Sequence, residues 1–583
     1  MSNTNLAGVP LTRPRRAPDA GPLDDRFYDL VEERLRRIFR DHPDSATFAG
    51  IHTEDHRLAD GSRDAVEQEI ADERAHLAAI EALDPAALSA EVRIERELEL
   101  HNLRRSLFDL EVHRVWERRS TALDTLGDAL FAVLARDFAP LTERLGSLAS
   151  RMEAVPAFLD QHRSRAIRPQ VRLWQTLELE SARELPAFFD EIAAAGRGVV
   201  GEADQRRLER AAAGASSAVE EYAGWLRATL DHAVDEWALG PELFDELVGL
   251  RAFDGLDARD ILAIGEEQLA ANKAARVATA REIDPTVDEA TVVDRIKRDH
   301  PATFAEALEG YQDAMRRARQ HLIDHEIVTV PPDERLIVIE TPAYQRHVIP
   351  FAAYFEPPKF DRDPTGIYVV TPSVGDDPNA MREHNWSSIS NTSIHEAYPG
   401  HHLQLSVANR HPSLTRFLTD APEFVEGWGM YSEQLMREHG FDDAPNFRLN
   451  MYTDAIWRAC RIVLDVRMHR GELSVEEAVR FLVQQTGFET ANARAEVHRY
   501  TYTPTYQLSY LLGKVLLLQL RADEQRRRGA AFSLRRLHDA LLANGSLPIS
   551  FHRRLLQANG QRADERDTDG RQAGERQTRG RPA

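Results

Sequence analysis

Apolar side chains recur at helical spacing along most of this chain, and this pattern constrains its fold more than any other feature. The pattern begins after Asp24, where apolar residues stand three or four positions apart: Phe27, Leu30, Val31, Leu35 and Ile38. The same spacing returns in several runs up to about residue 324. A stripe with a period near 3.6 residues is buried by packing one helix against another. The chain is therefore predicted to be mostly α-helical, in a large multi-helix architecture.

Prolines punctuate these helical runs. Those at positions 43, 85, 156, 241 and 301 are expected to mark helix starts or ends, because proline lacks the N–H that a helix interior needs. The helical pattern extends over residues 25–325 and resumes over residues 376–557, which we expect to form the catalytic region.

A short β-prone region separates the two helical regions, at residues 326–375. Its runs of β-branched and aromatic residues are separated by Pro, Gly and Asp, and cover Leu336–Glu340, Val348–Tyr354 and Gly366–Thr371. We expect a small antiparallel sheet just before the metal-binding helix. The last of these runs would either lie at the sheet edge, where an extended peptide could pair with it, or simply close the sheet.

The two ends of the chain are expected to be disordered. Residues 1–24 are rich in Pro, Arg, Gly and Asp, and residues 558–583 contain no large apolar side chain. Such segments bury too little apolar surface to offset the entropy of ordering them. Neither end is a candidate for chemistry.

Charge and composition exclude several classes of partner. Lys and Arg number 73 against 95 Asp and Glu, a net charge of -22 that disfavours nucleic acid and anionic membranes. We interpret the acidic surface as serving solubility, with cationic substrates as the alternative. The single cysteine, Cys460, lies in an apolar run and is predicted to be a core residue. No apolar stretch has the length of a signal peptide core or a membrane span, so a cytoplasmic protein is expected.

Histidine and glutamate gather in residues 390–406, SNTSIHEAYPGHHLQLS. Imidazole is a frequent zinc ligand, and a Glu beside the ion can act as general base towards water. In the helical His-Glu-x-x-His motif the second His stands four residues after the first. Here that position, counted from His395, is Pro399, and the next histidines are His401 and His402.

Two geometries would bring a second imidazole to the ion. A bulge at Pro399-Gly400 would interrupt the helix and give the second ligand position to His401. A regular helix would instead place His402 on the face of His395, about 10.5 Å away along the axis. We favour the bulge, because a Pro-Gly pair inside such a motif needs a reason.

The third ligand is predicted to be Glu426, which begins the segment EGWGMYSE 25 residues after His401. A second helix returning past the first would carry it to the site. Glu433 lies seven residues further on the same helix face and would either support a ligand or lie at the surface.

At this point the chain resembles a known family. His395–Gln404 is similar to the HExxPGHHLQ signature of the bacterial domain-of-unknown-function family 885, which is grouped with the gluzincin-like metallopeptidases. Further segments resemble the family's EGWxxYxE, RLVVDTGLH, PGQALSYxIG and PxxATxxGxH motifs; they begin at Glu426, Arg461, Pro504 and Pro43. The resemblance spans about residues 25 to 555 and implies a zinc hydrolase with a gluzincin-like architecture.

This chain departs from the family pattern at two places beside the expected pocket. Val466-Arg467-Met468 stands where Thr-Gly-Leu is usual, and Thr505-Tyr506 stands where Gly-Gln is usual. The metal motif itself is intact. These departures are expected to affect the choice of substrate and to leave metal binding unchanged.

The mechanism expected from these residues is hydrolysis by a zinc-activated water. Zn²⁺ would be held by His395, His401 and Glu426, because three protein ligands with an open position are typical of catalytic zinc. Glu396 would act as general base and then protonate the leaving amine. No other cofactor is expected, and the expected partner is a short peptide or small amide substrate, because the N-terminal helices would wall in a cleft.

The developing oxyanion needs a second electrophile, for which two candidates stand open. One is Tyr510, with Tyr502 and Tyr506 behind it, and the other is His402. A further open question is Asp465, which would either orient a ligand His or form a buried ion pair with a nearby arginine, Arg461 or Arg458.

Two other functions compete with a peptidase. The same zinc site would serve a metal-dependent hydrolase acting on an amide or ester of a specialised metabolite. A non-enzymatic helical scaffold with a structural metal, or none, is the second alternative.

Overall fold

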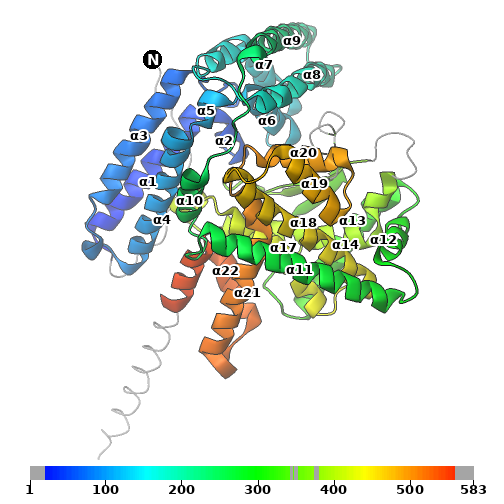
Figure 1. The fold of residues 1–583 in the computed structure, drawn as a ribbon. Coiled ribbons are helices and arrows are strands. Elements are labelled where there is room, and N and C mark those ends of the chain that lie inside the picture. Colours follow the sequence, from blue (N-terminus) through cyan, green and yellow to red (C-terminus); the bar gives the residue numbers. More distant parts are fainter. Residues whose placement is uncertain (1–19, 342–345, 347–348, 350–351, 373–379, 559–583) are drawn as a thin grey trace, which may run out of the picture.

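The computed structural model describes residues 20–341, 346, 349, 352–372 and 380–558, and it is mostly α-helical. Figure 1 shows the blue N-terminal helices beside a cyan and teal helical lobe, with a larger green, yellow and orange body below. No helix in this part of the chain is both long and apolar enough to span a bilayer.

The first helices pack around a core of their own. They are α1 (Pro22–Asp41), α2 (Pro43–Phe48), α3 (Arg63–Glu81) and α4 (Ala90–Leu107). Helix α1 starts inside the segment expected to be disordered, because Pro22 at its first position and Asp24 and Asp25 in its first turn suit a helix N-terminus. The remainder of the two predicted disordered ends, residues 1–19 and 559–583, lies outside the described residues.

The next helices form a lobe with a separate apolar core. They are α6 (Ala122–Ala135), α7 (Leu141–Arg163), α8 (Arg172–Ala195) and α9 (Glu202–Thr229), and the short helix α5 (Val115–Arg118) precedes them. Pro156 lies inside α7, so the prediction that it marks a helix boundary is wrong. Its neighbours Val155, Phe158 and Leu159 are buried in the lobe core, and this packing holds the helix together across the proline.

Four helices lead from the lobe to the sheet: α10 (Pro241–Leu250), α11 (Ala258–Ile283), α12 (Glu289–Arg298) and α13 (Phe304–Asp324). Helix α11 packs along α18 (Pro445–His469), and its Gly265 lies so close that an added Cβ would stand 2.6 Å from the Ile462 side chain.

A three-stranded sheet precedes the metal-binding region, with β1 (Leu336–Glu340), β2 (Ala352–Phe355) and β3 (Gly366–Val370) in the order β1-β3-β2. Strand β3 runs parallel to β1 and antiparallel to β2, so the sheet is mixed and the prediction of an antiparallel sheet is only partly right. Part of the run predicted at Val348–Tyr354 lies outside the described residues.

The position of β3 corrects the idea that an extended peptide adds to this strand. Both edges of β3 are already paired, one with β1 and one with β2, so its backbone has no free edge. The reason lies in burial: four of the five residues of β3 are buried, which suits a central strand, whereas three of the five residues of β1 are exposed, as in an edge strand.

Most of the remaining helices complete the largest core among the described residues: α14 (Trp386–Glu396), α15 (His401–Ala408), α17 (Pro422–Glu438), α18, α21 (Ser509–Arg528) and α22 (Leu534–Ala543). Helix α16 (Leu414–Phe417) packs against the core of the first helices, and α19 (Val475–Thr486) and α20 (Thr490–Tyr500) pack with α18 around a smaller core. Helices α17 and α21 cross with their backbones almost touching. A Cβ on Gly513 would lie 1.9 Å from the carbonyl oxygen of Glu423 and 2.8 Å from the Cα of Gly427.

Candidate metal centre

The metal motif spans an interruption between two helices. Helix α14 ends at Glu396 and α15 begins at His401. The Gly400 N–H donates to the Ile394 carbonyl at 3.0 Å, and a Cβ on Gly400 would lie 1.7 Å from the carbonyl oxygen of His395. Only glycine allows the chain to fold back so closely. The predicted interruption is therefore confirmed, and the regular-helix alternative is wrong.

The interruption brings two imidazoles together with a carboxylate from α17. The rings of His395 and His401 stand nearly perpendicular, with centroids 4.7 Å apart. Their Nε2 atoms lie 3.6 Å and 3.4 Å from the same oxygen, Oε2 of Glu426. The structure thus brings together the three side chains that the sequence predicts as metal ligands.

The two distances to the Glu426 oxygen are close to those between ligands of one ion. The separations are longer than the 2.7–2.9 Å typical of a charge-assisted hydrogen bond. Ligands about 2.0–2.1 Å from a tetrahedral zinc ion stand about 3.3–3.4 Å from one another. Each imidazole nitrogen therefore stands from the Glu426 oxygen at nearly the separation of two zinc ligands, and the three side chains have the chemistry of a zinc ligand set.

Glu396 lies beside the same pair of imidazoles. One of its carboxylate oxygens and ligand atoms of His395 and His401 all lie within 4.8 Å of one another. Both histidines are buried, whereas Glu396 is partly exposed. The predicted base therefore stands at the solvent side of the centre, where it can meet a water molecule.

Helix α17 is fixed against the interruption by two contacts. The indole N–H of Trp428 donates to the Pro399 carbonyl at 2.7 Å. Gly429 leaves room for the His395 ring, because a Cβ there would stand 2.7 Å from the ring atoms Cε1 and Nε2. The Gly-rich segment EGWGMYSE of α17 therefore carries Glu426 and also leaves space for the imidazole of His395, which comes from α14.

Glu433 supports His395 from the other side of the ring. The Nδ1 atom of His395 lies 2.7 Å from Oε1 of Glu433, whose other oxygen accepts from Asn391 Nδ2 at 3.0 Å. Asn391 Nδ2 also donates to Asp454. A carboxylate on one ring nitrogen fixes the tautomer and leaves the other nitrogen free for a metal. The sequence leaves open whether Glu433 supports a metal ligand or lies at the surface, and the structure shows that it supports His395.

Asp465 does not take that supporting position. Its carboxylate accepts a hydrogen bond from the backbone N–H of Thr505 at 2.8 Å. Arg461 pairs with Glu496, and Arg458 lies nearest to Asp454. Both roles that the sequence suggests for Asp465 are therefore wrong, because α18 points it at the turn before α21.

The charged side chains at the centre shift one another's pKa values. Burial lowers the pKa of His395, but the neighbouring carboxylates of Glu426 and Glu433 outweigh it and raise that pKa to about 10. Burial opposes ionisation of Glu426, yet His395 and His401 hold its pKa well below its usual range. The centre thus holds carboxylate anions around a protonated imidazole, and a divalent cation would take the place of that proton.

Two tyrosines approach the centre from the start of α21. The Tyr506 hydroxyl donates to Oε1 of Glu426 at 3.0 Å, and the Tyr510 hydroxyl lies 3.4 Å from that of Tyr506. Burial and then Glu426 raise the pKa of both tyrosines, so both remain protonated donors. Tyr502 instead lies under the Arg119 guanidinium, 3.7 Å from its ring centroid.

The contact of Tyr506 with a predicted ligand is one that the sequence did not single out. Its placement follows from Thr505, a buried residue whose φ of +67° lies in the left-handed region that β-branched residues rarely adopt. This turn precedes the short 3-10 helix Tyr506–Leu508. The only signal in the sequence is that Thr505-Tyr506 replaces the Gly-Gln usual in the family it resembles.

His402 lies in a different network. Its side chain is fully buried; Nε2 stands 2.6 Å from Glu334 Oε2, and Nδ1 stands 3.0 Å from the Tyr354 hydroxyl. Glu334 also accepts from Tyr398 at 2.7 Å and from Arg319 at 2.7 Å. Both ring nitrogens are therefore engaged: Nδ1 joins α15 to β2, and Nε2 joins it to the segment just before β1. The structure does not bring His402 to the other predicted site residues, and nothing in the sequence marked Glu334 as its partner.

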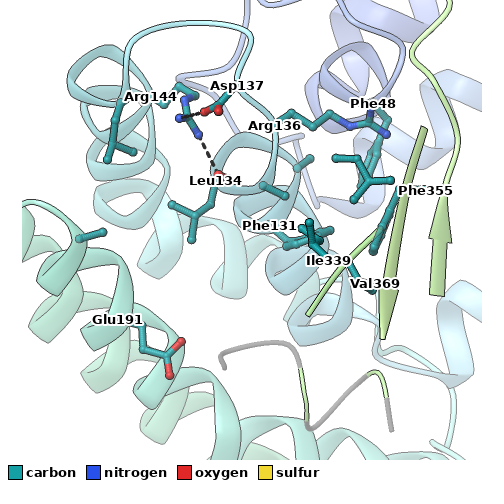
Figure 2. A pocket seen from close by; sticks show the side chains of 15 residues that line it. Phe48, Phe131, Leu134, Arg136, Asp137, Arg144, Glu191, Ile339, Phe355 and Val369 are labelled. Atoms are coloured by element: carbon teal, nitrogen blue, oxygen red, sulfur yellow. Dashed lines mark hydrogen bonds and ion pairs between the residues drawn. The ribbon is translucent and has the colours of Figure 1, made fainter. Parts of the chain in front are cut away.

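A separate apolar hollow lies on the other face of the sheet. It has a volume of about 380 Å³ and lies between α6, α8 and the sheet, with Phe131, Leu134, Phe355 and Val369 among its lining residues (Figure 2). It shares no lining residue with the metal centre.

Comparison with solved structures supports the fold. A proposed lipoprotein of unknown function from Shewanella oneidensis superposes with a TM-score of 0.76 at 22% identity, covering 91% of this chain and 99% of that one. A proposed lipoprotein from Colwellia psychrerythraea gives a TM-score of 0.80 at 17% identity, with 92% and 98% covered. At such identities the likeness shows the fold alone.

Sequence comparison identifies the family but no activity. No curated protein matches the chain. The model of a family described as bacterial protein of unknown function, family 885 of the domains of unknown function, matches residues 43–556. This match covers both helical regions, the sheet and every residue of the metal centre, and the chain therefore belongs to that family.

Proposed function

We propose that the protein is a zinc-dependent hydrolase that cleaves amide bonds in short peptides, within a gluzincin-like group. The observation that carries this proposal is the approach of His395 Nε2 and His401 Nε2 to one oxygen of Glu426, at 3.6 and 3.4 Å. Three protein ligands are typical of catalytic zinc, whereas a structural site takes four. This difference argues against a scaffold that merely holds a metal.

The chain's own residues then divide the reaction between them. When bound, the ion would supply a Lewis acid that makes water nucleophilic near neutral pH. Glu396 takes one proton from the attacking water, whose oxygen joins the carbonyl carbon, and delivers that proton to the leaving nitrogen as the C–N bond breaks. The immediate products are a carboxylic acid and an amine, and the second proton of the water then passes from the acid to the amine to give a carboxylate and an ammonium group.

The tyrosines serve two different purposes in this proposal. Tyr506 holds the outer oxygen of Glu426 and so orients the ligand. Tyr510, whose hydroxyl has only the 3.4 Å contact with Tyr506 among the described residues, can donate to the developing oxyanion. His402 is a positioning residue, because it ties α15 to Glu334 and Tyr354.

Substrate size follows from the burial of the centre. The side chains of His395, His401 and Glu426 are only 8, 10 and 12% exposed. A folded protein surface cannot reach groups buried this far, whereas a single extended chain can. Short peptides are therefore favoured over intact proteins, and the same access would admit a small amide or ester.

The experiment combines metal analysis with a peptide library. Wild-type protein should carry about one zinc per chain and cleave library members, as measured by mass spectrometry of metal content and products. Glu396→Gln should keep the zinc and lose about 10²–10⁴-fold in kcat, the usual contribution of a general base. Glu383→Gln, an exposed residue paired with Lys297, is the matched control and should behave as wild type. Wild type that holds no zinc and cleaves nothing would refute the proposal.

A further inference from the structure

Two arginines of α18 lie beside the tyrosines of the metal centre. The guanidinium carbon of Arg461 is 4.6 Å from the ring centroid of Tyr510, and that of Arg458 is 5.9 Å away. Both guanidinium groups also lie over Trp457, at 4.2 Å and 4.0 Å. Two cations thus share one aromatic surface next to the proposed oxyanion donor.

These arginines are incompletely paired. Arg461 donates from Nη2 to Glu496 at 3.0 Å and from Nε to the Tyr500 hydroxyl at 3.3 Å, but its buried Nη1 has no hydrogen-bond partner among the described residues. Its side chain is 4% exposed. Buried guanidinium N–H groups are almost always satisfied in native proteins, so this donor is available to a water or a ligand from outside the chain.

Arg458 is paired even less. Its Nε and Nη1 are buried without a hydrogen-bond partner in the described part of the chain. Its Nη1 forms an ion pair with Oδ1 of Asp454 at 3.6 Å, which is beyond hydrogen-bonding distance, and the other oxygen of Asp454, Oδ2, accepts from Asn391 and Asn450. The Arg458 side chain keeps 16% exposure, so part of it faces solvent next to these buried donors.

The pair lies within reach of a substrate held at the metal centre. From Oε1 of Glu426, the path runs 3.0 Å to the Tyr506 hydroxyl, 3.4 Å on to that of Tyr510, and across the Tyr510 ring to the arginines. An extended peptide advances about 3.3–3.6 Å per residue. A route through successive contacts is longer than the straight distance, so a few residues beyond the scissile bond suffice to reach the two cations.

The chemistry of the missing partner follows from the donors. A guanidinium presents a planar fork of N–H groups that matches a carboxylate in bidentate fashion. A peptide substrate carries one such group at a fixed place, its C-terminal α-carboxylate. We propose that Arg458 and Arg461 bind this carboxylate, so that the protein is a carboxypeptidase that releases a short C-terminal fragment. This inference rests on the hydrolase function proposed above.

The test compares matched peptides on the zinc-loaded protein. One carries a free C-terminus, the second is the same peptide amidated, and the third is amidated with Glu as its last residue. We expect amidation to lower kcat/KM at least about 30-fold, mainly through KM, since the carboxylate binds outside the reacting bond. Equal rates for the free and amidated peptides would overturn the proposal. Full activity on the third peptide would also overturn it, because an acidic side chain would then be the ligand.

Variants of Arg458 test whether the effect of amidation on kcat/KM depends on these arginines. Arg458→Ala should collapse the ratio of free-acid to amide kcat/KM to near one, while the zinc content stays that of wild type. Arg458→Lys should restore part of the ratio, because it returns a charge without the fork. Arg480→Ala, an exposed arginine of α19, is the control and should keep the full ratio. A ratio unchanged in Arg458→Ala would contradict the assignment.

A binding measurement separates this inference from the proposed function. Titration calorimetry of an N-acetylated tripeptide into wild type and Glu396→Gln needs no turnover. Binding of the free acid at least tenfold tighter than the amide supports the carboxylate site even if no peptide is cleaved. Equal binding refutes the site, whatever the activity.

Discussion

At the scale of single residues, the metal centre is organised around His395. One ring nitrogen faces Glu426 and the other lies 2.7 Å from Glu433, while Gly429 provides the space that the ring fills. A ligand whose second nitrogen is held by a carboxylate is both oriented and made more basic. Glu433 should therefore control metal affinity without contacting the metal.

Replacing Glu433 with Gln tests this role. The amide keeps the shape but removes the charge that holds the His395 proton on Nδ1, so the affinity for zinc should fall about 10–100-fold. Titration against a chromophoric chelator measures it. Glu438→Gln, an exposed change on the same helix, serves as control and should leave the affinity unchanged. Equal zinc affinity in wild type and Glu433→Gln would show that Glu433 does not tune the ligand.

At the scale of elements, the crossing of α17 and α21 sets the geometry of the site. Helix α17 carries Glu426, and Tyr510 lies on α21, just after the turn that holds Tyr506. The two helices approach through Gly427 and Gly513, where a Cβ would meet backbone atoms. A backbone cannot move aside as a flexible side chain can, so only glycine permits this approach.

Gly513→Ala should therefore be costly. The helices must separate to admit the methyl group, and we expect a loss of about 3 kcal/mol, at the upper end for overpacking, since the clash is with backbone. Gly214→Ala is the control: it lies inside α9 with nothing within 4 Å of its Cβ, and it should be neutral or stabilising by up to about 1 kcal/mol.

The midpoint of thermal unfolding, followed by circular dichroism, compares the two variants. Zinc affinity should also fall in Gly513→Ala, because Glu426 moves with α17. Equal midpoints for the two variants would mean that the crossing is not as tight as described.

At the scale of the whole molecule, the metal centre belongs to one of several cores. The ligands come from α14, α15 and α17, which pack in the largest core together with parts of α11, α18 and α21. Helices α6 to α9 form a lobe around a separate core (Figure 1). Metal binding should therefore directly stabilise the core that contains the metal centre, and it should leave the stability of the α6–α9 lobe almost unaffected.

Hydrogen exchange followed by mass spectrometry tests this division. With free zinc at about 1,000 times its Kd, binding adds about 4 kcal/mol to the stability of the core that holds it. Exchange should slow in α14, α15 and α17 and stay unchanged in α7 to α9. Glu426→Ala should remove the effect. Uniform slowing across the chain would instead indicate that both cores unfold as one unit.

The sequence alone determined the helical class, the positions of the β-prone runs, and the interrupted helix that joins His395 to His401. Each of these depends on neighbours in the chain: a 3.6-residue period, β-branched runs, or a Pro-Gly pair that no regular helix contains. The helix across Pro156 shows the limit of such local rules, because buried contacts from other helices hold it together.

Only the tertiary structure decided which of several similar side chains meets which partner. His402 meets Glu334, 68 residues away, and Tyr506 meets Glu426, 80 residues away. The pairing of β3 with both β1 and β2 was likewise decided by the tertiary structure. Contacts over such separations depend on how helices and strands cross, and a crossing is set by the packing of whole surfaces, which no short sequence pattern records.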